Sequence, residues 1–263
     1  MEFIPILLPA LIAGILVVIT HIPLGSEVLR RGIVFIDLAL AQTAALGSIV
    51  VTWAIYHGGH QAHEHFGTAL VYVASYAAAI LCASLLYFIR KAPAKIQEGL
   101  IGSIFILASS TSILLLSEHP QGGEHLKDIL VGQILWVRWQ DIIVACLITL
   151  LVLAGLFLFK YRQNQFVFYP TLAIAITLST QLVGVYLVFA TLIIPSLAVY
   201  RHKKSLLLAY LIGIAGYVSG LILSVPIDSP SGSLIVITLA STGFLVWLLI
   251  GTTTKNSQNS VDQ

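Results

Sequence analysis

Long apolar runs, each about the length of a membrane-spanning helix, alternate with short polar gaps along the whole chain. A spanning helix needs about 20 mostly apolar residues. The runs of this kind are Phe3–Leu24, Ile33–Tyr56, Thr68–Ile89, Gln97–Ser117, Asp141–Phe159, Leu206–Val225 and Ser233–Ile250. The stretch Phe166–Tyr200 is too long for one span, and its Gly184 and Pro195 suggest broken or tilted helices that cross and return. The pattern predicts an all-α, polytopic membrane helix bundle of about nine transmembrane segments.

The lysine and arginine residues sit in alternate gaps. The basic gaps hold Arg30 and Arg31; Arg90, Lys91 and Lys95; Lys160 and Arg162; Arg201, Lys203 and Lys204; and, in the tail, Lys255. The gaps between them, at 57–65, 118–125 and 226–232, carry histidine and acidic residues instead. Because cytoplasmic loops are enriched in Lys and Arg, we expect the N-terminus outside and the C-terminus in the cytoplasm.

Composition excludes a soluble domain. Of the 263 residues, 58% are hydrophobic and only 9% are charged, whereas soluble proteins are about 25% charged. The mean hydropathy is +0.99. The net charge of +2 is too small to indicate nucleic acid as a partner, so the expected environment is membrane lipid. We expect one transmembrane domain, residues 1–251, followed by a disordered cytoplasmic tail, residues 252–263.

Asp37 is the clearest candidate for a functional residue, since ionisable groups inside spans are costly. It shares a helix face with the small residues Ala41 and Ala44, which is typical of a helix-packing surface. Asp37 therefore points into the bundle near its cytoplasmic end. Two interpretations remain open: an anchor paired with Arg30 or Arg31, or a carboxylate in an ion pathway.

Two further polar groups lie inside spans. Gln42 follows Asp37 by five residues, about 140° round a straight helix, so the two do not chelate one ion; a hydrogen bond between helices is the simpler role for Gln42. Gln181 and Ser179 form a second polar spot beside the break expected at Gly184. Backbone groups freed at such a break need partners or line a cavity.

The segment before the fifth span has the composition of a membrane interface. Trp136, Arg138 and Trp139 stand together, and Asp141 follows them. Tryptophan is enriched at membrane–water interfaces. We therefore expect an interfacial belt with a charged anchor.

Four of the eight histidines fall in one outer loop. They are His57, His60, His63 and His65, and Glu64 accompanies them. Imidazole and carboxylate suit zinc and, with less preference, manganese or iron. The spacing is neither HExxH nor that of a zinc finger. The loop either captures metal loosely or is simply hydrophilic.

Five segments resemble the permease subunits of the zinc/manganese/iron class of ABC importers. They are Val28–Gly47, Glu98–Phe105, Asp128–Leu135 with Asp141, Val183–Pro195 and Leu223–Gly232. The resemblance implies a homodimeric, non-enzymatic permease of a bacterial inner membrane. It also implies two cytoplasmic ATPase subunits, which hold the ATP, and an extracytoplasmic metal-binding protein. The cargo would be a divalent metal ion, with zinc or manganese the first expectations.

Two positions depart from the family pattern. The family carries Asp and His four residues apart in the second span, and the corresponding residues here are Leu38 and Gln42, with Asp37 shifted by one. A cytoplasmic coupling segment of the family is also short here, because only Phe159–Phe166 joins two spans. The alternative is therefore a degenerate permease homologue that senses metal or acts as a scaffold. An intramembrane hydrolase is disfavoured, because no paired catalytic residues suit it.

The metal contacts predicted from the sequence form two groups. The outer group is the histidine loop, and the inner group is a polar pathway that includes Asp37, Gln42 and Gln181.

Overall fold

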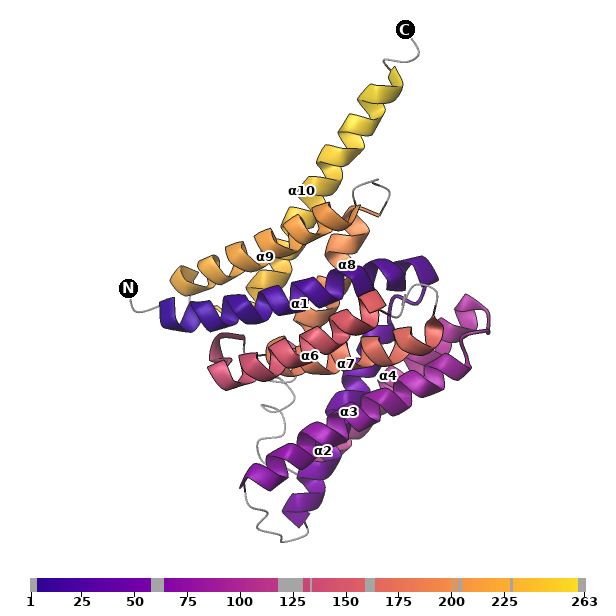
Figure 1. Cartoon of the computed structure of the whole chain (residues 1–263), viewed down its shortest axis with the longest axis vertical. Coiled ribbons are helices and arrows are strands. Elements are labelled where there is room, and N and C mark those ends of the chain that lie inside the picture. Colours follow the sequence, from indigo (N-terminus) through magenta and orange to yellow (C-terminus); the bar gives the residue numbers. More distant parts are fainter. Residues whose placement is uncertain are drawn as a thin grey trace.

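The computed structural model describes residues 4–57, 64–117, 130–132, 134–158, 164–200, 202, 205–227 and 229–259. Within these ranges the regular structure is entirely helical (Figure 1). The helices are α1 (Ile4–Arg31), α2 (Ile36–His57), α3 (Glu64–Phe88), α4 (Ala94–Ser117), the 3-10 helix η1 (Ile134–Trp136), α6 (Trp139–Leu158), α7 (Gln165–Val183), α8 (Val185–Ala198), α9 (Ser205–Ile227) and α10 (Ser231–Asn259). Eight of them are long and apolar enough to cross a membrane. The predicted all-α, polytopic bundle is confirmed.

The stretch that was expected to cross and return forms the two helices α7 and α8, with the break at Gly184. Helix α7 has full spanning length. Helix α8 has 14 residues, about 21 Å, which is shorter than the ~30 Å hydrocarbon core. Pro195 lies inside α8 rather than at a break. The ninth predicted segment is therefore a short helix.

Glycine backbones meet directly at this break. Gly184 has φ 82° and Gly132 has φ 70°. A Cβ atom on Gly184 would lie 2.4 Å from the backbone nitrogen of Gly132, and one on Gly132 would lie 2.2 Å from the carbonyl oxygen of Val183. At the start of α10, a Cβ on Gly232 would lie 2.7 Å from the carbonyl oxygen of Val131. The turn at 130–132 is therefore in backbone contact with both the α7–α8 junction and α10.

Helix α1 packs closely on α8 and α9 around a proline. Pro23 has no N–H, so the carbonyl of Ile19 loses its usual helical partner. The Tyr210 hydroxyl of α9 donates to that carbonyl at 3.2 Å. Two residues after Pro23, Gly25 lies so close to α8 that an added Cβ would overlap the carbonyl of Leu192.

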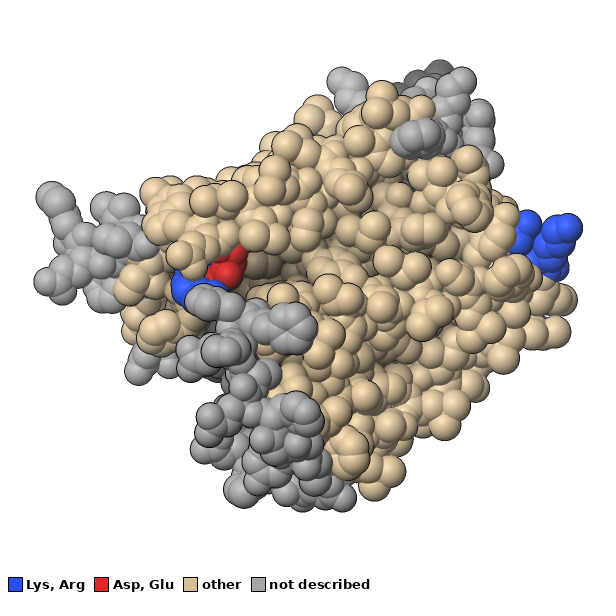
Figure 2. All heavy atoms as spheres, turned by 60° about the horizontal axis from the view of Figure 1, so that its bottom comes forward, with Lys and Arg blue, Asp and Glu red and all other residues tan. Residues whose placement is uncertain are grey.

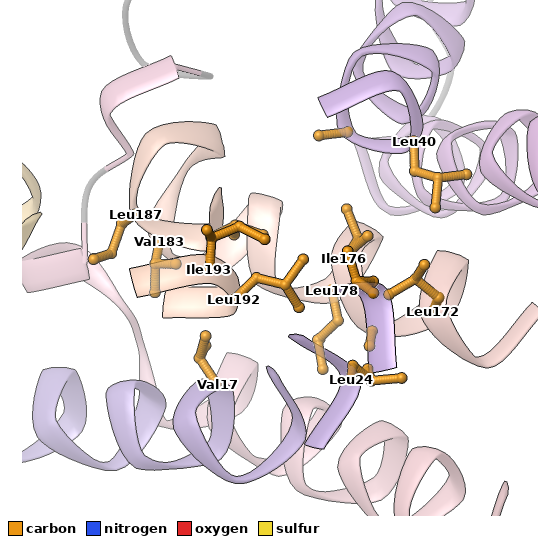
Figure 3. Packing of buried hydrophobic residues seen from close by; sticks show 14 of the residues in the cluster. Val17, Leu24, Leu40, Leu172, Ile176, Leu178, Val183, Leu187, Leu192 and Ile193 are labelled. Atoms are coloured by element: carbon orange, nitrogen blue, oxygen red, sulfur yellow. The ribbon is translucent and has the colours of Figure 1, made fainter. Parts of the chain in front are cut away.

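Apolar side chains from α1, α2, α7 and α8 meet at the centre of the bundle (Figure 3). Among the labelled residues, Val17 and Leu24 come from α1, Leu40 from α2, Leu172, Ile176, Leu178 and Val183 from α7, and Leu187, Leu192 and Ile193 from α8. All of these side chains are buried. The middle of the bundle is a packed apolar core.

The outer surface fits a bilayer. On the face shown in Figure 2, the described charged side chains form one group towards the left and one at the right edge, and the described surface between them carries no charged side chain. Large apolar side chains such as Leu81, Leu107 and Phe157 are exposed on the surface of the chain, as lipid contact requires. The chain is a multi-pass membrane protein.

Helix α10 differs from the sequence-based expectation at its end. It continues to Asn259, so residues 252–259 are helical where a disordered tail was expected, and residues 260–263 lie outside the described part of the chain.

We predict that Gly184→Ala destabilises the protein, because the new methyl group meets backbone atoms and because the Gly184 backbone, with φ 82° and ψ 162°, lies in a region that costs other residues about 1–3 kcal/mol. Gly99→Ala on α4 is the matched control, since an added Cβ there has no atom of the rest of the protein within 4 Å and alanine favours a helix. Thermal unfolding in detergent compares the two. Equal stability of the two variants would contradict the proposed backbone contact.

Candidate functional site

The α1–α2 turn holds Asp37 in a fixed place. Helix α1 ends in a turn in which the N–H of Gly32 donates to the carbonyl of Leu29 at 3.2 Å and the N–H of Ile33 donates to the carbonyl of Val28 at 3.3 Å. Gly32 has φ 70°, as expected just after a helix end. Helix α2 then begins at Ile36, so Asp37 lies in its first turn.

Aromatic stacking sets the start of α2 against α8. The rings of Phe35 and Phe189 are stacked, with centroids 6.3 Å apart and planes within 8°. Asp37 itself is 1% exposed. Neither of its carboxylate oxygens has a hydrogen-bond partner. A buried carboxylate without partners is costly, and such groups in membrane spans are functional candidates.

The expected ion pair between Asp37 and Arg30 or Arg31 does not form, because both arginines bind Glu27 instead. Arg30 donates through Nε and Nη2 to the two oxygens of Glu27, at 2.8 and 2.5 Å. Arg31 Nε donates to Glu27 Oε1 at 2.6 Å. The Arg31 guanidinium also lies 4.0 Å from the centre of the Phe168 ring on α7. The anchor at this end of α1 is therefore Glu27.

The apolar pattern ends the first span at Leu24 and therefore does not mark Glu27 as part of a helix. Helix α1 actually continues to Arg31, and Glu27 is only 1% exposed. A signal was present: Glu27 precedes the two arginines by three and four residues, the spacing at which helical side chains pair.

The small residues beside Asp37 pack as expected. Ala41 and Ala44 are buried, and Ser75 of α3 donates to the carbonyl of Ala44 at 2.9 Å. Gly47 continues this close approach, since an added Cβ would lie 2.6 Å from the carbonyl of Ala74. The predicted packing surface on α2 is confirmed.

The remaining inner residues lie apart from Asp37. Gln42 is 2% exposed, and its five-residue spacing from Asp37 within α2 puts it on another face. Leu38 is half-buried. Near the break, Ser179 is buried whereas Gln181 is exposed, so these two do not form a joint polar spot.

The histidine loop falls largely outside the described residues. His57 ends α2 and His65 lies in the first turn of α3, but His60 and His63 belong to the undescribed segment 58–63. Next to these helix ends, a hollow of about 390 Å³ is lined by Thr52, Ile55, Gly67, Thr68, Val71 and Tyr72. In the described part of the chain, no three His, Cys, Asp or Glu side chains gather to hold a metal.

A second buried ionisable residue, His21, sits in α1. Its Nδ1 lies 3.1 Å from the carbonyl of Val17 and 3.0 Å from the Thr20 hydroxyl. A carbonyl only accepts, so Nδ1 carries the proton and Nε2 a lone pair; Nε2 has no hydrogen-bond partner. The Nδ1 contacts fit a structural role for His21 within α1.

At the opposite end of the bundle, the expected charged anchor is present. Arg138 Nε and Nη2 donate to Asp141 at 3.1 and 3.2 Å. This hydrogen bonding raises the pKa of the Arg138 guanidinium above its usual value. Trp136 and Trp139 beside it are exposed, which fits an interfacial belt.

Comparison with known proteins identifies the family. The model of the ABC 3 transport family matches residues 3–170 and 159–251. The chain belongs to the ABC 3 transport family. It is therefore a permease of the metal-transporting ABC class and not itself an enzyme.

Its relatives in the ABC 3 family are named for metal transport. The "Manganese transport system membrane protein MntC" of Halalkalibacterium halodurans is 27% identical over 258 residues, covering 89% of this chain and 84% of the relative. A "Probable metal transport system membrane protein" of Chlamydia trachomatis is 24% identical, covering 94% and 90%. A "Probable iron transport system membrane protein" of Haemophilus influenzae is 26% identical, covering 73% and 78%.

A solved structure shares the ABC 3 permease fold. It is that of PsaBC from Streptococcus pneumoniae in complex with Fab, which superposes with a TM-score of 0.70 at 20% identity. The match covers 94% of this chain and 93% of the other.

We predict that Asp37→Asn leaves the stability unchanged or raises it, because an amide costs less to bury without partners than a carboxylate. Glu27→Gln is the contrasting variant and should lose about 1–3 kcal/mol, since it removes the acceptor charge of two arginines. Thermal unfolding of both variants in the same detergent measures the difference. An Asp37→Asn variant as unstable as Glu27→Gln would show that Asp37 is an anchor after all.

Proposed function

We propose that this protein is the membrane subunit of an importer that carries a divalent metal ion across a bacterial inner membrane, driven by a separate ATPase. The observation that carries the proposal is the Asp37 carboxylate, which is buried in the first turn of α2 with both oxygens unpartnered. In a member of a metal-transport family, such a group is suited to bind a cation on its way through the membrane.

The ligand chemistry favours manganese as the first cargo to test. The inner pathway residues Asp37 and Gln42 both supply oxygen, and carboxylate and carbonyl oxygens suit Mn²⁺ better than Zn²⁺. Because Gln42 stands where the resemblance implies histidine, the imidazole that zinc prefers is missing there. One relative is itself named as a manganese transport protein. The four-histidine loop suits zinc or manganese at the outer entrance.

The packing of the protomer supports a homodimer. The space between α1, α2, α7 and α8 is filled by apolar side chains (Figure 3), which offer no polar route for an ion within that part of the chain. A route between two copies avoids this core.

The remaining partners follow from the orientation. With the basic gaps inside, the N-terminus is outside and the C-terminus is cytoplasmic. The ATPase then binds on the side of Arg30 and Arg90, and an extracytoplasmic metal-binding protein delivers the ion on the side of the histidine loop. The short connector Phe159–Phe166 lies mostly outside the described residues, since 159–163 are not described.

We predict that Asp37→Asn abolishes Mn²⁺ uptake at normal expression, because the amide has no charge with which to hold the cation. Asp141→Asn is the matched control, since that carboxylate is partly exposed and already bound to Arg138; uptake should persist in it. Uptake of radioactive Mn²⁺ in cells that lack the chromosomal copy measures both. Wild-type uptake by the Asp37→Asn variant would remove Asp37 from the pathway.

A second prediction concerns the outer loop. Replacement of His57, His60, His63 and His65 by alanine should slow uptake at limiting metal and leave it unchanged at saturating metal, because a capture site matters only when the ion is scarce. The rate is measured against metal concentration for both Mn²⁺ and Zn²⁺. Identical rates at limiting concentrations of both metals would eliminate the capture role.

A further inference from the structure

Two arginines stand immediately before the turn that leads to Asp37, yet the carboxylate remains unpaired. Arg31 precedes Asp37 by six residues, and the hydrogen-bonded turn at Gly32 and Ile33 joins the two helices. Opposite charges attract strongly where water is scarce. On sequence alone, a pair between Asp37 and one of the arginines is the natural expectation.

Glu27 prevents this pairing in the structure. Its Oε1 accepts from Arg30 Nη2 and from Arg31 Nε, and its Oε2 accepts from Arg30 Nε. Both carboxylate oxygens are thus used. Glu27 is 1% exposed and sits inside α1, so the acceptor cannot move far.

The Phe168 ring holds one of the arginines from the other side. The Arg31 guanidinium lies 4.0 Å from the centre of this buried ring, close enough for a cation–π interaction. Tyr169 packs edge-on against Phe168, with centroids 5.4 Å apart. Arg31 is therefore fixed between Glu27 on α1 and an aromatic pair on α7, and it makes no hydrogen bond to the Asp37 oxygens.

We propose that Glu27 is a positioning residue for the metal pathway: it binds Arg30 and Arg31 and so keeps both oxygens of Asp37 available to a divalent cation. The proposal rests on the function proposed above for Asp37. Glu27 does not touch the cation; its effect is to remove an internal competitor. The pair of arginines would otherwise occupy the carboxylate and exclude the metal.

The test compares Glu27→Gln with the triple variant Glu27→Gln/Arg30→Gln/Arg31→Gln in the Mn²⁺ uptake assay. In the single variant the released arginines compete with the metal for Asp37, so the apparent KM for Mn²⁺ should rise about tenfold or more, with a smaller change in the maximal rate. In the triple variant the competitors are gone, and the KM should return to the wild-type value. The other four basic gaps remain to orient the chain.

Separate measurement of the KM and the maximal rate distinguishes this role from a purely structural one. If Glu27 only stabilises α1, Glu27→Gln lowers the amount of folded protein and the maximal rate at an unchanged KM, which would overturn the proposal. The proposal would also be overturned if the triple variant reached wild-type abundance but kept a raised KM for Mn²⁺. In that case removal of the competing arginines would not have restored metal binding at Asp37.

Two further variants complete the design. If Glu27→Gln does not accumulate in the membrane, Glu27→Asp replaces it: the shorter carboxylate keeps the charge but holds the arginines less well, and the KM should rise by a smaller factor. An unchanged KM in that variant counts against the proposal. Asp37→Asn in the same assay tests the underlying function separately, since uptake that survives that change refutes the role of Asp37 whatever the Glu27 variants do.

Discussion

A polypeptide that crosses a bilayer must satisfy its own backbone hydrogen bonds, because hydrocarbon offers no partners. The architecture described here follows from this constraint wherever a helix is interrupted. Pro23 removes one donor from α1, and the Tyr210 hydroxyl of α9 replaces it at the carbonyl of Ile19. At the α7–α8 break, the backbone of Gly184 lies against that of Gly132. Both interruptions are therefore also the points at which separate parts of the bundle are joined most tightly.

Charged side chains inside a bilayer also need partners, because hydrocarbon offers none. Near the α1–α2 turn, Glu27 and the two arginines have partners, whereas Asp37 has no hydrogen-bond partner. Glu27, Arg30 and Arg31 form a compact cluster in which Glu27 accepts three hydrogen bonds from the two arginines. Asp37, six residues after Arg31, is buried without a hydrogen-bond partner. A fold selected only for stability would pair this carboxylate or replace it. The contrast within one turn is the physical reason for placing function at Asp37 rather than at the arginine cluster.

The apolar pattern predicted most of the fold, because span length and loop charge are set by the bilayer and can be read locally. It failed where polar residues continue a helix: Glu27 and the arginines were read as a gap although α1 extends to Arg31, and α10 runs on to Asn259. Asp37 was found because a charge inside a span stands out in any sequence. The lack of a partner for Asp37 could not be predicted, because it depends on whether Arg30 and Arg31 bind Asp37 or Glu27. The continuation of α1 to Arg31 and the contact of Arg31 with Phe168 on α7 favour Glu27.

Family membership determines the fold of this chain more firmly than it determines the metal-binding residues. A solved structure at only 20% identity keeps the same course of helices, because packing tolerates exchange among apolar residues of similar volume. A metal site does not tolerate such exchange, since each ligand contributes a particular atom at a particular place. Moving the carboxylate by one position to Asp37 turns it by about 100° round α2, away from the side of Leu38 and into the core of the chain. In the proposed function, the cation then reaches this carboxylate from a different direction than it would reach a carboxylate at position 38. The arrangement of Glu27, Arg30 and Arg31 bears on the proposed metal binding only because of this position.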